Sequence, residues 1–528
     1  MNQSILYEDE AKKALVKGIN VLAEAVAVTM GPKGRNVVLA KQQQAPKIIN
    51  DGVTVAQEIS LPNCIENAGA SLVKEAAAKT NDIAGDGTTT ATVLAHQIIT
   101  QGLQYTTAGV NAMKLKSGIL KSVHFVNDLI VEYARPVNNS SDIVQIATIS
   151  ANNDLQIGET IAKAFQKAGR EGIITLEEGK STVTELEITE GMQFDKGFMS
   201  PYFIDKNNIT GTLIKEDPFV LLTDQDLSSI SKEIIPILEL VIKQKKPLVL
   251  IAKDIEQKAL STLIMNYLKN TVDIVAIKAP GFGNEITNFL EDIAVLTKGT
   301  LITQESGLKF NQLETNMLGK ARQIVITKSS TTIVANKEDS AVKQQCHFIR
   351  KQIETSDSLY EKEKLENRLS KLSGGVAIIR VGANTEVEMY EKKLRFEDAI
   401  NATKAAISEG IIPGGGSTLA HISLQVKKWA ENNLEEDEQL GASLITQSLV
   451  APIKRIAANS GKNGNFILYK LYSYPNNIGY NALHDNFSDL FVTGIIDPAK
   501  VTRCALQNAA SIASMILTTE CVIPEEAA

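Results

Sequence analysis

The sequence has few of the residues on which disulfide-rich domains and zinc sites depend. Its 528 residues include four cysteines, Cys64, Cys346, Cys504 and Cys521, which lie far apart and never in C-x-x-C spacing. This distribution excludes a disulfide framework and a cysteine zinc site, and it fits a reducing compartment. The five histidines lack H-x₃-H spacing as well, so we expect no structural transition metal.

Long apolar runs and excess basic charge are also missing. No stretch of 18 apolar residues occurs, so no membrane span is expected. The first residues have neither the basic and apolar regions of a signal peptide nor the Arg- and Ser-rich character of a transit peptide. We therefore expect the protein to work where it is made. A net charge of −7 repels phosphate backbones, so no nucleic-acid partner is expected.

What is present is the composition of a folded globular protein. Hydrophobic residues make up 44% of the chain and charged residues 22%, which excludes a disordered or collagen-like protein. The length suggests about three to four domains.

Both ends of the chain show the i, i+3, i+4 spacing of apolar residues that predicts amphipathic helices. The predicted helices span residues 9–28, 68–79, 88–102, 396–409, 442–460 and 498–517. We therefore expect both ends to belong to one helical domain.

The middle of the chain alternates short apolar runs with helical stretches. Strands are predicted at residues 219–223, 247–252, 272–278 and 299–303, with helices between them at 229–243, 255–269 and 285–296. Strands separated by helices of about 10–15 residues predict βαβ units with parallel strands. Residues 340–372 are rich in charge at i, i+4 spacing, which predicts a solvated helical hairpin.

Glycine and proline mark the changes between these parts. Pro136 and Gly191 precede the middle segment, and Gly374–Gly375 and Gly410 follow the charged hairpin. Two breaks on each side indicate an outer domain that is interrupted by a connector, which is itself interrupted by the βαβ domain. Such breaks serve as hinges or as simple loops, and the sequence leaves both readings open.

The densest motif is Gly85-Asp-Gly-Thr-Thr-Thr90, at the predicted start of a helix. Two glycines allow a ligand to approach the backbone, and the helix start offers N–H groups and a positive dipole end to a phosphate. The carboxylate oxygens of Asp86 are hard ligands, the type that Mg²⁺ prefers, so Asp86 could hold this cation. A capped helix after a glycine turn is the alternative, but a cap needs only one Thr or Asp. The motif therefore favours phosphate binding.

Other candidate motifs are weaker. Thr29-Met-Gly-Pro-Lys-Gly-Arg35 lacks Walker A spacing and also fits a helix stop, and Gly414-Gly-Gly416 also fits a linker. Asp51 lies in a predicted strand–turn–strand over residues 47–55, where a hairpin turn explains it. Asp398 fits a solvated helix face, and Asp497, before Pro498, fits an N-cap of the last helix.

The predicted helices at 229–243 and 255–269 have more apolar residues than one packed face requires. In the second helix they spread over roughly 200°, against a stripe of about 100° for a helix that packs one face on a sheet. Pro236 is expected to kink the first helix or to lie in its first turn. The additional apolar residues either pack inside the domain or form an exposed groove for apolar partners.

Several blocks of the sequence resemble the group I chaperonins, the GroEL-type family. They are Val28-Thr-Met-Gly-Pro-Lys-Gly-Arg-Asn-Val-Val38, Gly85-Asp-Gly-Thr-Thr-Thr-Ala-Thr-Val-Leu94, Ala279-Pro-Gly-Phe-Gly283, Gly382-Ala-Asn-Thr-Glu-Val-Glu-Met389, Gly479-Tyr-Asn-Ala482 and Asp497-Pro-Ala-Lys-Val-Thr-Arg503. The resemblance covers essentially the whole chain, in order, and the blocks are highly specific.

This resemblance implies a multidomain α/β protein with a GroEL-like fold. It places an α-helical equatorial ATP-binding domain at residues 1–133 and 409–528, a small α+β intermediate hinge domain at 134–190 and 376–408, and an α/β apical domain at 191–375. It also implies rings of seven subunits, usually stacked in pairs and closed by a GroES-type co-chaperonin.

The resemblance further implies the site residues. ATP is expected at Thr29, Gly31, Pro32, Asp86, Gly87, Thr88, Thr89, Thr90, Gly415, Asn481, Ala482 and Asp497, with Asp86 as the Mg²⁺ ligand and K⁺ near the phosphates. Asp51 and Asp398 correspond to the carboxylates linked to activation of the attacking water. Non-native proteins are expected to bind Phe198, Tyr202, Phe203, Ile235, Leu238, Leu260, Ile264 and Met265. Leu483 departs from the family, which has a small residue beside the adenine.

The resulting interpretation is an ATP hydrolase that binds non-native proteins and encloses them for folding. An ATP-independent holdase or scaffold is the first alternative, and the intact Asp51, Asp86 and Asp398 argue against it. A small-molecule phosphotransferase is the second, and the missing Walker A and kinase signatures argue against that. The segments at residues 7–14 and 46–54 look most like cyanobacterial and plastid members, which favours the plastid stroma over a bacterial cytoplasm.

Overall fold

The structure is a computed structural model. It describes residues 5–40, 47–49, 51–169, 173–179, 181–204, 211–281, 283, 285–303, 307–335, 340–355, 359–373 and 375–524. The chain divides into two compact units. The helical unit comprises Met1–Lys163, Glu178–Thr184 and Val381–Ala528, and the sheet unit comprises Ala164–Glu177 and Glu185–Arg380. The finer division into three domains stays a prediction.

The helical unit is built from both ends of the chain, whose helices were predicted from their apolar periodicity. The N-terminal part contributes α1 (Glu8–Ala27), α2 (Gly52–Glu58), α3 (Cys64–Ala84), α4 (Thr88–Thr107), α5 (Ala112–Tyr133), α6 (Ser140–Ser150) and the first part of α7 (Leu155–Ala168). The C-terminal part contributes α13 (Glu386–Glu409), α14 (Ser417–Asn433), α15 (Glu436–Ser448), α16 (Ala451–Asn459), α17 (Gly464–Leu471), α18 (Leu490–Thr493) and α19 (Ala499–Leu517).

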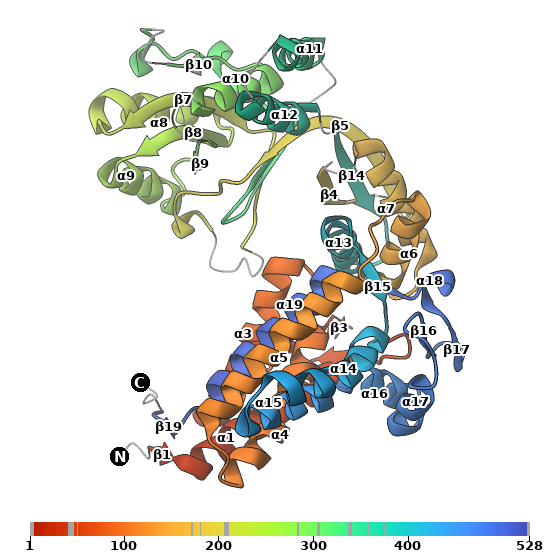
Figure 1. Ribbon diagram of the computed structural model, residues 1–528. Coiled ribbons are helices and arrows are strands. Elements are labelled where there is room, and N and C mark those ends of the chain that lie inside the picture. The colour runs from red at the N-terminus through yellow and green to blue at the C-terminus, as the bar shows by residue number, and fades with distance from the viewer. Residues whose placement is uncertain are drawn as a thin grey trace. The chain divides into compact units, whose positions relative to one another are not determined.

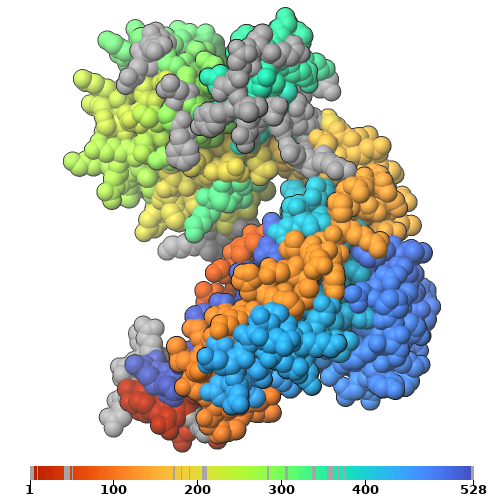
Figure 2. Space-filling model, viewed as in Figure 1, coloured from red at the N-terminus to blue at the C-terminus, as the bar shows by residue number. Residues whose placement is uncertain are grey.

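The last helix packs into the bundle that the first helices form. Helix α19 contacts α3, α4 and α5 (Figure 1), so residues from opposite ends of the sequence share one apolar core. In Figure 2 the red-to-orange and blue segments adjoin within this unit. Leu94, Ile119 and Leu506 are fully buried in this core. The prediction that both ends join in one helical assembly is therefore confirmed.

Two local predictions for this unit are wrong. Residues 442–460 form two helices, α15 and α16, because Pro452 lies in the first turn of α16 and cannot continue the preceding helix. Residues 47–55 do not form a strand–turn–strand. Strand β3 (Lys47–Ile49) is followed by helix α2, since the Asp51 side chain caps that helix despite the β-branched residues within it.

Four small antiparallel strand pairs complete the helical unit. They are β1 (Leu6–Tyr7) with β19 (Cys521–Val522), β2 (Val37–Leu39) with β3, β15 (Ile411–Pro413) with β18 (Ile496–Pro498), and β16 (Ile478–Asn481) with β17 (Asn486–Asp489). In the third pair, Ile412 lies opposite Asp497. Arg135 and Ile411 exchange two backbone hydrogen bonds of 2.8 Å, which join the chain near Pro136 to the chain near Gly410.

The sheet unit contains the predicted βαβ arrangement. Parallel strands lie in the order β10 (Leu301–Ile302), β7 (Phe219–Leu227), β8 (Leu248–Ile255) and β9 (Ile274–Lys278), and β11 (Gly319–Lys320) pairs antiparallel with β7. The connecting helices are α8 (Ile235–Gln244), α9 (Gln257–Leu268) and α10 (Glu285–Thr297). A short π-helix, Ile230–Ile234, precedes α8, and Pro236 lies in the first turn of α8, as the sequence allowed.

A second sheet has six strands. Their order is β4 (Ile173–Glu178), β14 (Gly375–Val381), β5 (Glu185–Phe194), β13 (Thr331–Val334), β12 (Gln323–Ile326) and β6 (Leu213–Glu216). Strand β5 changes neighbours at Gly191, because Glu190 pairs with Gly375 and Gly191 with Val334. A Cβ atom at Gly191 would lie 2.2 Å from a Val376 methyl carbon. Gly191 is thus a strand residue at a crowded crossing rather than a break in the chain, and Gly374 lies outside the described residues.

The charged segment forms the predicted hairpin, with α11 (Ser340–Thr355) and α12 (Leu359–Ser373). It is not solvated on all sides, since Ile349 and Leu372 join the core of the sheet unit. Asp292 of α10 is fully buried and accepts hydrogen bonds from Arg368 at 2.8 Å and Gln345 at 3.0 Å. This buried carboxylate anchors the hairpin. Among the described helices, none is both long and apolar enough to cross a bilayer.

Candidate functional site

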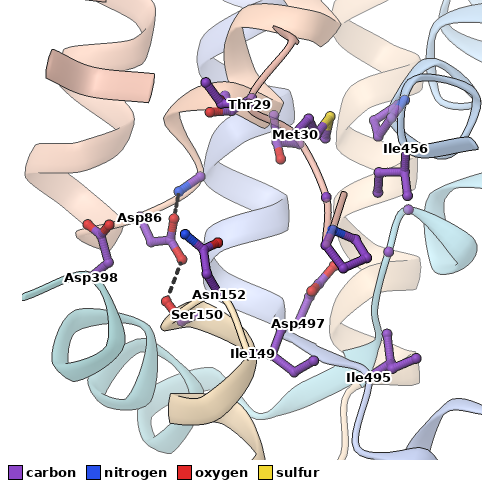
Figure 3. A pocket seen from close by; sticks show the side chains of 18 of the residues that line it. Thr29, Met30, Asp86, Ile149, Ser150, Asn152, Asp398, Ile456, Ile495 and Asp497 are labelled. Atoms are coloured by element: carbon purple, nitrogen blue, oxygen red, sulfur yellow. Dashed lines mark hydrogen bonds between the residues drawn. The ribbon is translucent and has the colours of Figure 1, made fainter. Parts of the chain in front are cut away.

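A cavity of about 400 Å³ lies within the helical unit (Figure 3). Its walls come from segments that are far apart in the sequence. All fourteen residues expected at the nucleotide and at the attacking water line it: Thr29, Gly31, Pro32, Asp51, Asp86, Gly87, Thr88, Thr89, Thr90, Asp398, Gly415, Asn481, Ala482 and Asp497. The structure therefore brings this entire set together.

Helix α4 begins at the cavity, at the residue that the sequence predicted. Gly85 ends α3 and Gly87 precedes α4, both with positive φ, at 71° and 88°. A Cβ at Gly87 would also lie 2.6 Å from a Val501 methyl carbon, so glycine suits this turn in both conformation and space. No side chain caps the helix start. The N–H groups of the first turn, at Thr88, Thr89 and Thr90, can therefore bind an anion together with the helix dipole.

A second helix start faces the same cavity. Helix α14 begins at Ser417, after Gly416, and no side chain caps it either. The preceding Gly414 is packed closely, because a Cβ there would lie 2.7 Å from Oδ1 of Asp497. The Gly414–Gly416 segment is thus a built turn at the cavity wall rather than a flexible linker. Two uncapped helix starts at one cavity suit a ligand with several negative charges.

The carboxylates in the cavity are partly withdrawn from water and influence one another. Asp86 accepts hydrogen bonds from the Gly87 N–H and, at 3.2 Å, from the Ser150 hydroxyl. Desolvation nevertheless raises the pKa of Asp86, and the charge of Asp51 raises it further. Desolvation also raises the pKa of Asp398 well above its ordinary value, with additional effects of Asp86 and Asp51. This part of the cavity favours a bound cation.

Asp51 is held in place by the helix that it caps. Its carboxylate accepts hydrogen bonds from Val53 N at 3.0 Å, Thr54 N at 2.9 Å and the Thr54 hydroxyl at 2.6 Å. A Cβ at Gly52 would lie 2.2 Å from the Thr89 hydroxyl oxygen. Because Gly52 has no side chain, the starts of α2 and α4 can lie against each other, which places Asp51 near the first turn of α4.

Asp497 does not cap the last helix, contrary to the simplest sequence interpretation. The residue before α19 is Pro498, and no side-chain hydrogen bond caps that helix. Asp497 lies on β18 and faces the cavity. Desolvation raises the pKa of Asp497 to about 6, with a smaller effect of the Asp86 charge, while the Gly415 N–H donates to the carboxylate and opposes the rise.

The loop after α1, with Thr29, Gly31 and Pro32, and the β16–β17 hairpin also line the cavity. The Asn459 amide donates to Ala27 O at 3.0 Å and to Met30 O at 2.9 Å, which holds the chain on either side of Thr29. At the hairpin, Asn481 Oδ1 accepts from Leu483 N at 3.1 Å and His484 N at 3.2 Å. Apolar side chains complete these walls, among them Ile456 and Ile495. A flat apolar ring fits between such side chains.

Sequence reasoning missed several residues of this cavity. Ser150 is the last residue of α6 and Asn152 and Asn153 follow it. Four more lie on the same helix as Asp398: Tyr390, Glu391, Leu394 and Arg395. Asn152 and Asn153 have φ values of 57° and 65°. Asparagine is one of the residues that adopt the left-handed conformation at helix ends, so the Asn152–Asn153 pair was a signal for this turn, although no helix was predicted before it. The position of the α13 residues at the cavity could not be predicted from the sequence, because it depends on how that helix packs.

The eight apolar residues expected to bind non-native proteins all lie in the sheet unit, but they differ in exposure. Tyr202, Ile235 and Met265 are exposed, by 68%, 43% and 52%, while Leu260 and Ile264 are half-buried. The expectation of exposure is wrong for three others, which belong to the core: Phe198, Phe203 and Leu238.

Each of these three core residues has a physical reason for its burial. Phe203 packs edge-on against Tyr267, with ring centroids 5.6 Å apart. Leu238 lies on the face of α8 that also buries Ile237 and Val241. Phe198 forms a β-bridge with Ile277 of strand β9. Exposed apolar residues beyond the expected set include Ile242 and Leu268.

The cavity contains no ready-made cage for a metal. Among the described residues, no cluster of three or more His, Cys, Asp or Glu side chains could hold one. Mg²⁺ needs no such cage, because proteins usually bind it through one or two carboxylates together with phosphate oxygens and water. The Asp86 carboxylate, whose pKa is raised chiefly by desolvation, and the neighbouring Asp398, whose pKa desolvation and nearby carboxylates raise, therefore fit Mg²⁺ accompanied by a phosphate ligand.

Comparisons with known proteins agree over the whole chain. The model of the TCP-1/cpn60 chaperonin family matches residues 22–527. A chloroplastic chaperonin GroEL of Gracilaria tenuistipitata var. liui is 54% identical over 526 residues, which are 100% of this chain and 99% of the relative. The chaperonin gp146 of bacteriophage EL 2 (Pseudomonas aeruginosa), crystallised in the presence of ATP-BeFx, shares the fold. Its TM-score is 0.70 at 23% identity, over 99% of each chain.

Proposed function

Because the chain belongs to the TCP-1/cpn60 chaperonin family, as a group I, GroEL-type member, we propose that the cavity of the helical unit is where it binds and hydrolyses ATP. The protein is an ATP-dependent chaperonin of the plastid: it hydrolyses ATP, assembles with copies of itself and assists the folding of non-native proteins. The assignment of individual residues to these activities is our proposal.

One observation carries the location of the ATP site. Fourteen residues from seven separate stretches of the sequence line one cavity, and they combine two uncapped helix starts with a cluster of carboxylates. The helix starts suit the phosphates. We assign the adenine to the side of Asn481 and Ala482 and the ribose to Asp497, on the basis of the resemblance. We assign Asp86 to Mg²⁺, which would offset the charge of the phosphates when bound.

Asp51 and Asp398 have the properties of groups that act on the attacking water. Asp51 is fixed by its helix cap, so it can hold a water molecule in one orientation. Asp398 has a pKa raised well above its ordinary value by desolvation and by neighbouring carboxylates. A carboxylate with a raised pKa binds a proton more strongly, which favours it as the acceptor of a proton. In this proposal Asp398 accepts a proton from the water molecule as the water oxygen attacks the γ-phosphate. The bond between the γ-phosphorus and the bridging oxygen breaks, and ADP leaves.

Non-native proteins bind, in our proposal, to the exposed apolar residues of the sheet unit. Tyr202, Ile235 and Met265, with the half-buried Leu260 and Ile264, keep apolar surface in contact with water. Such surface is costly unless a partner covers it, which supports a docking role. The buried Phe198, Phe203 and Leu238 support this surface from below rather than contact the bound protein directly.

Finer features of assembly rest on the resemblance. We propose rings of seven subunits, stacked in pairs, a GroES-type co-chaperonin as lid, and K⁺ near the phosphates. The test is an ATPase assay combined with refolding of a denatured protein, with and without a GroES-type lid and with Na⁺ in place of K⁺. Refolding that needs ATP and improves with the lid supports the proposal. Binding of the denatured protein without ATP hydrolysis would favour the holdase alternative.

A further inference from the structure

Arg395 lines the ATP cavity, although no expectation from the sequence included it. It lies on α13, three residues before Asp398, so the two side chains share one face of the helix. The Arg395 side chain is 31% exposed. It can therefore be reached by a ligand in the cavity.

The charge around Arg395 is strongly unbalanced. Besides Asp51, Asp86, Asp398 and Asp497, the cavity is lined by Glu391. Among the described residues that line it, Arg395 is the only lysine or arginine. A nucleoside triphosphate adds further negative charge. An arginine is always protonated, so its positive charge is present at any physiological pH.

Part of the Arg395 guanidinium has no hydrogen-bond partner within the part of the chain that the structure describes. One terminal nitrogen of Arg395 donates to Glu391, one helical turn earlier. The Nε atom is buried and has no hydrogen-bond partner among the described residues. The charges that act on the pKa of Asp398 are all negative, so Arg395 is not committed to that carboxylate either. A buried donor without a partner is expected to be satisfied when a ligand binds.

We propose that Arg395 binds the γ-phosphate of ATP, held in orientation by Glu391, so that it distinguishes ATP from ADP. This inference rests on the proposed function of the cavity. The γ-phosphate is the group attacked by the water molecule from which Asp398 accepts a proton, and Arg395 lies on the same face of the same helix as Asp398. Guanidinium groups bind phosphate oxygens through paired, charge-assisted hydrogen bonds. A contact with the γ-phosphate also stabilises the charge that develops there during transfer.

The experiment compares two ligands that differ only in the γ-phosphate. Affinities of MgATP and MgADP are measured for the full chain, with hydrolysis slowed by Asp398→Ala in both backgrounds. Arg395→Gln keeps a polar side chain without charge. It is expected to lower the affinity for MgATP by about tenfold or more, the usual effect of losing a charged hydrogen bond. The affinity for MgADP should fall by less than about twofold, since ADP lacks the γ-phosphate that Arg395 contacts. Arg395→Lys keeps the charge but loses the paired geometry, so its MgATP affinity should be intermediate.

Two controls separate the possible failures. Glu391→Gln leaves the guanidinium in place but releases it, and should reduce MgATP affinity less than Arg395→Gln does. Equal weakening of MgATP and MgADP in Arg395→Gln would overturn the inference, because it would indicate a structural role. Unchanged MgATP affinity would overturn it too. If the unmodified chain bound neither nucleotide, the proposed function itself would fail. If Arg395→Gln does not fold, the affinities for MgATP and MgADP are compared in Arg395→Lys instead.

Discussion

The negative charge of Asp86 raises the pKa of Asp398, although the two residues come from opposite ends of the sequence. Asp86 lies in the turn between α3 and α4, and Asp398 lies on α13. Asp51, at the start of α2, raises the pKa of both. Because the charge of Asp51 raises the pKa of both Asp86 and Asp398, the arrangement indicates a site that is completed by positive charge. The predictions below follow from this arrangement and from the exposed apolar surface.

Asp398→Ala is expected to leave ATP binding near normal and to slow hydrolysis by at least ~100-fold, as for a general base that acts only in the reacting state. Single-turnover hydrolysis and an equilibrium binding assay measure the two effects separately. Glu386→Gln is the matched control, because this carboxylate is on the same helix but is exposed and does not line the cavity. Turnover that is unchanged in Asp398→Ala would disprove the assignment.

Asp86→Ala is expected to remove the dependence of nucleotide binding on Mg²⁺. In the unmodified chain, chelation of the metal by EDTA should weaken ADP binding, because the phosphates and Asp86 then face each other without a cation. In Asp86→Ala, EDTA should make little difference. Titration of ADP with and without Mg²⁺, followed by calorimetry, measures both. A variant that responds to Mg²⁺ as strongly as the unmodified chain places the metal elsewhere.

Asp497 should make the nucleotide-free protein less stable as pH rises between about 4 and 6. Its pKa is raised from 3.8 to about 6 in the folded chain, so the folded state binds more protons than the unfolded state within this window. The contribution of Asp497 to the free energy of unfolding therefore falls as pH rises from about 4 to 6, and it does not change further above this window. A shift of two units corresponds to ~3 kcal/mol, which we reduce to about 1–2 kcal/mol because Asp497 is only half-buried and solvent screens the charge.

The test of this pH effect is Asp497→Asn, which removes the charge and keeps the shape. At pH 7 the melting temperature of the nucleotide-free variant should exceed that of the unmodified chain, and the difference should shrink towards pH 4. Nucleotide affinity should fall, since the proposed ribose contact is lost. A melting temperature that is equal or lower at pH 7 would show that the buried charge does not destabilise the folded state.

Ile235 and Leu238 form a matched pair on one helix, since Ile235 is 43% exposed and Leu238 only 8%. Ile235→Ser should change stability by no more than about 0.5–1 kcal/mol, as surface changes do, while weakening capture of unfolded protein. Leu238→Ser should cost about 3 kcal/mol or more, because it leaves a cavity and a buried hydroxyl. Melting temperature and capture of a denatured protein are compared for both variants.

ATP hydrolysis should be near normal in Ile235→Ser, because the proposed ATP site lies in the other unit. Met265→Ser provides an independent test from helix α9, where the side chain is 52% exposed. Large stability losses in Ile235→Ser and Met265→Ser, with capture retained, would return these residues to the core and leave the binding surface unlocated.

The sequence by itself determined the class of the protein, its helical ends and its parallel sheet. These features depend on local periodicity and on short motifs, such as Gly85–Thr90, whose residues are neighbours in the chain. It also contained enough specific blocks for the expected ATP residues to be named one by one. The wrong local predictions arose where two signals compete: the β-branched residues after Asp51 suggested a strand, but the capping carboxylate began a helix.

Tertiary structure alone decided which side chains face one another. Arg395 is an ordinary surface arginine in the sequence, and only the placement of α13 puts it in a cavity crowded with carboxylates. Leu238 and Ile235 are both apolar and lie one helical turn apart, yet one is buried and the other exposed, because the face that a helix presents to its sheet depends on its rotation against the neighbouring strands. The raised pKa of Asp398 likewise arises from charges that approach it only when the chain has folded.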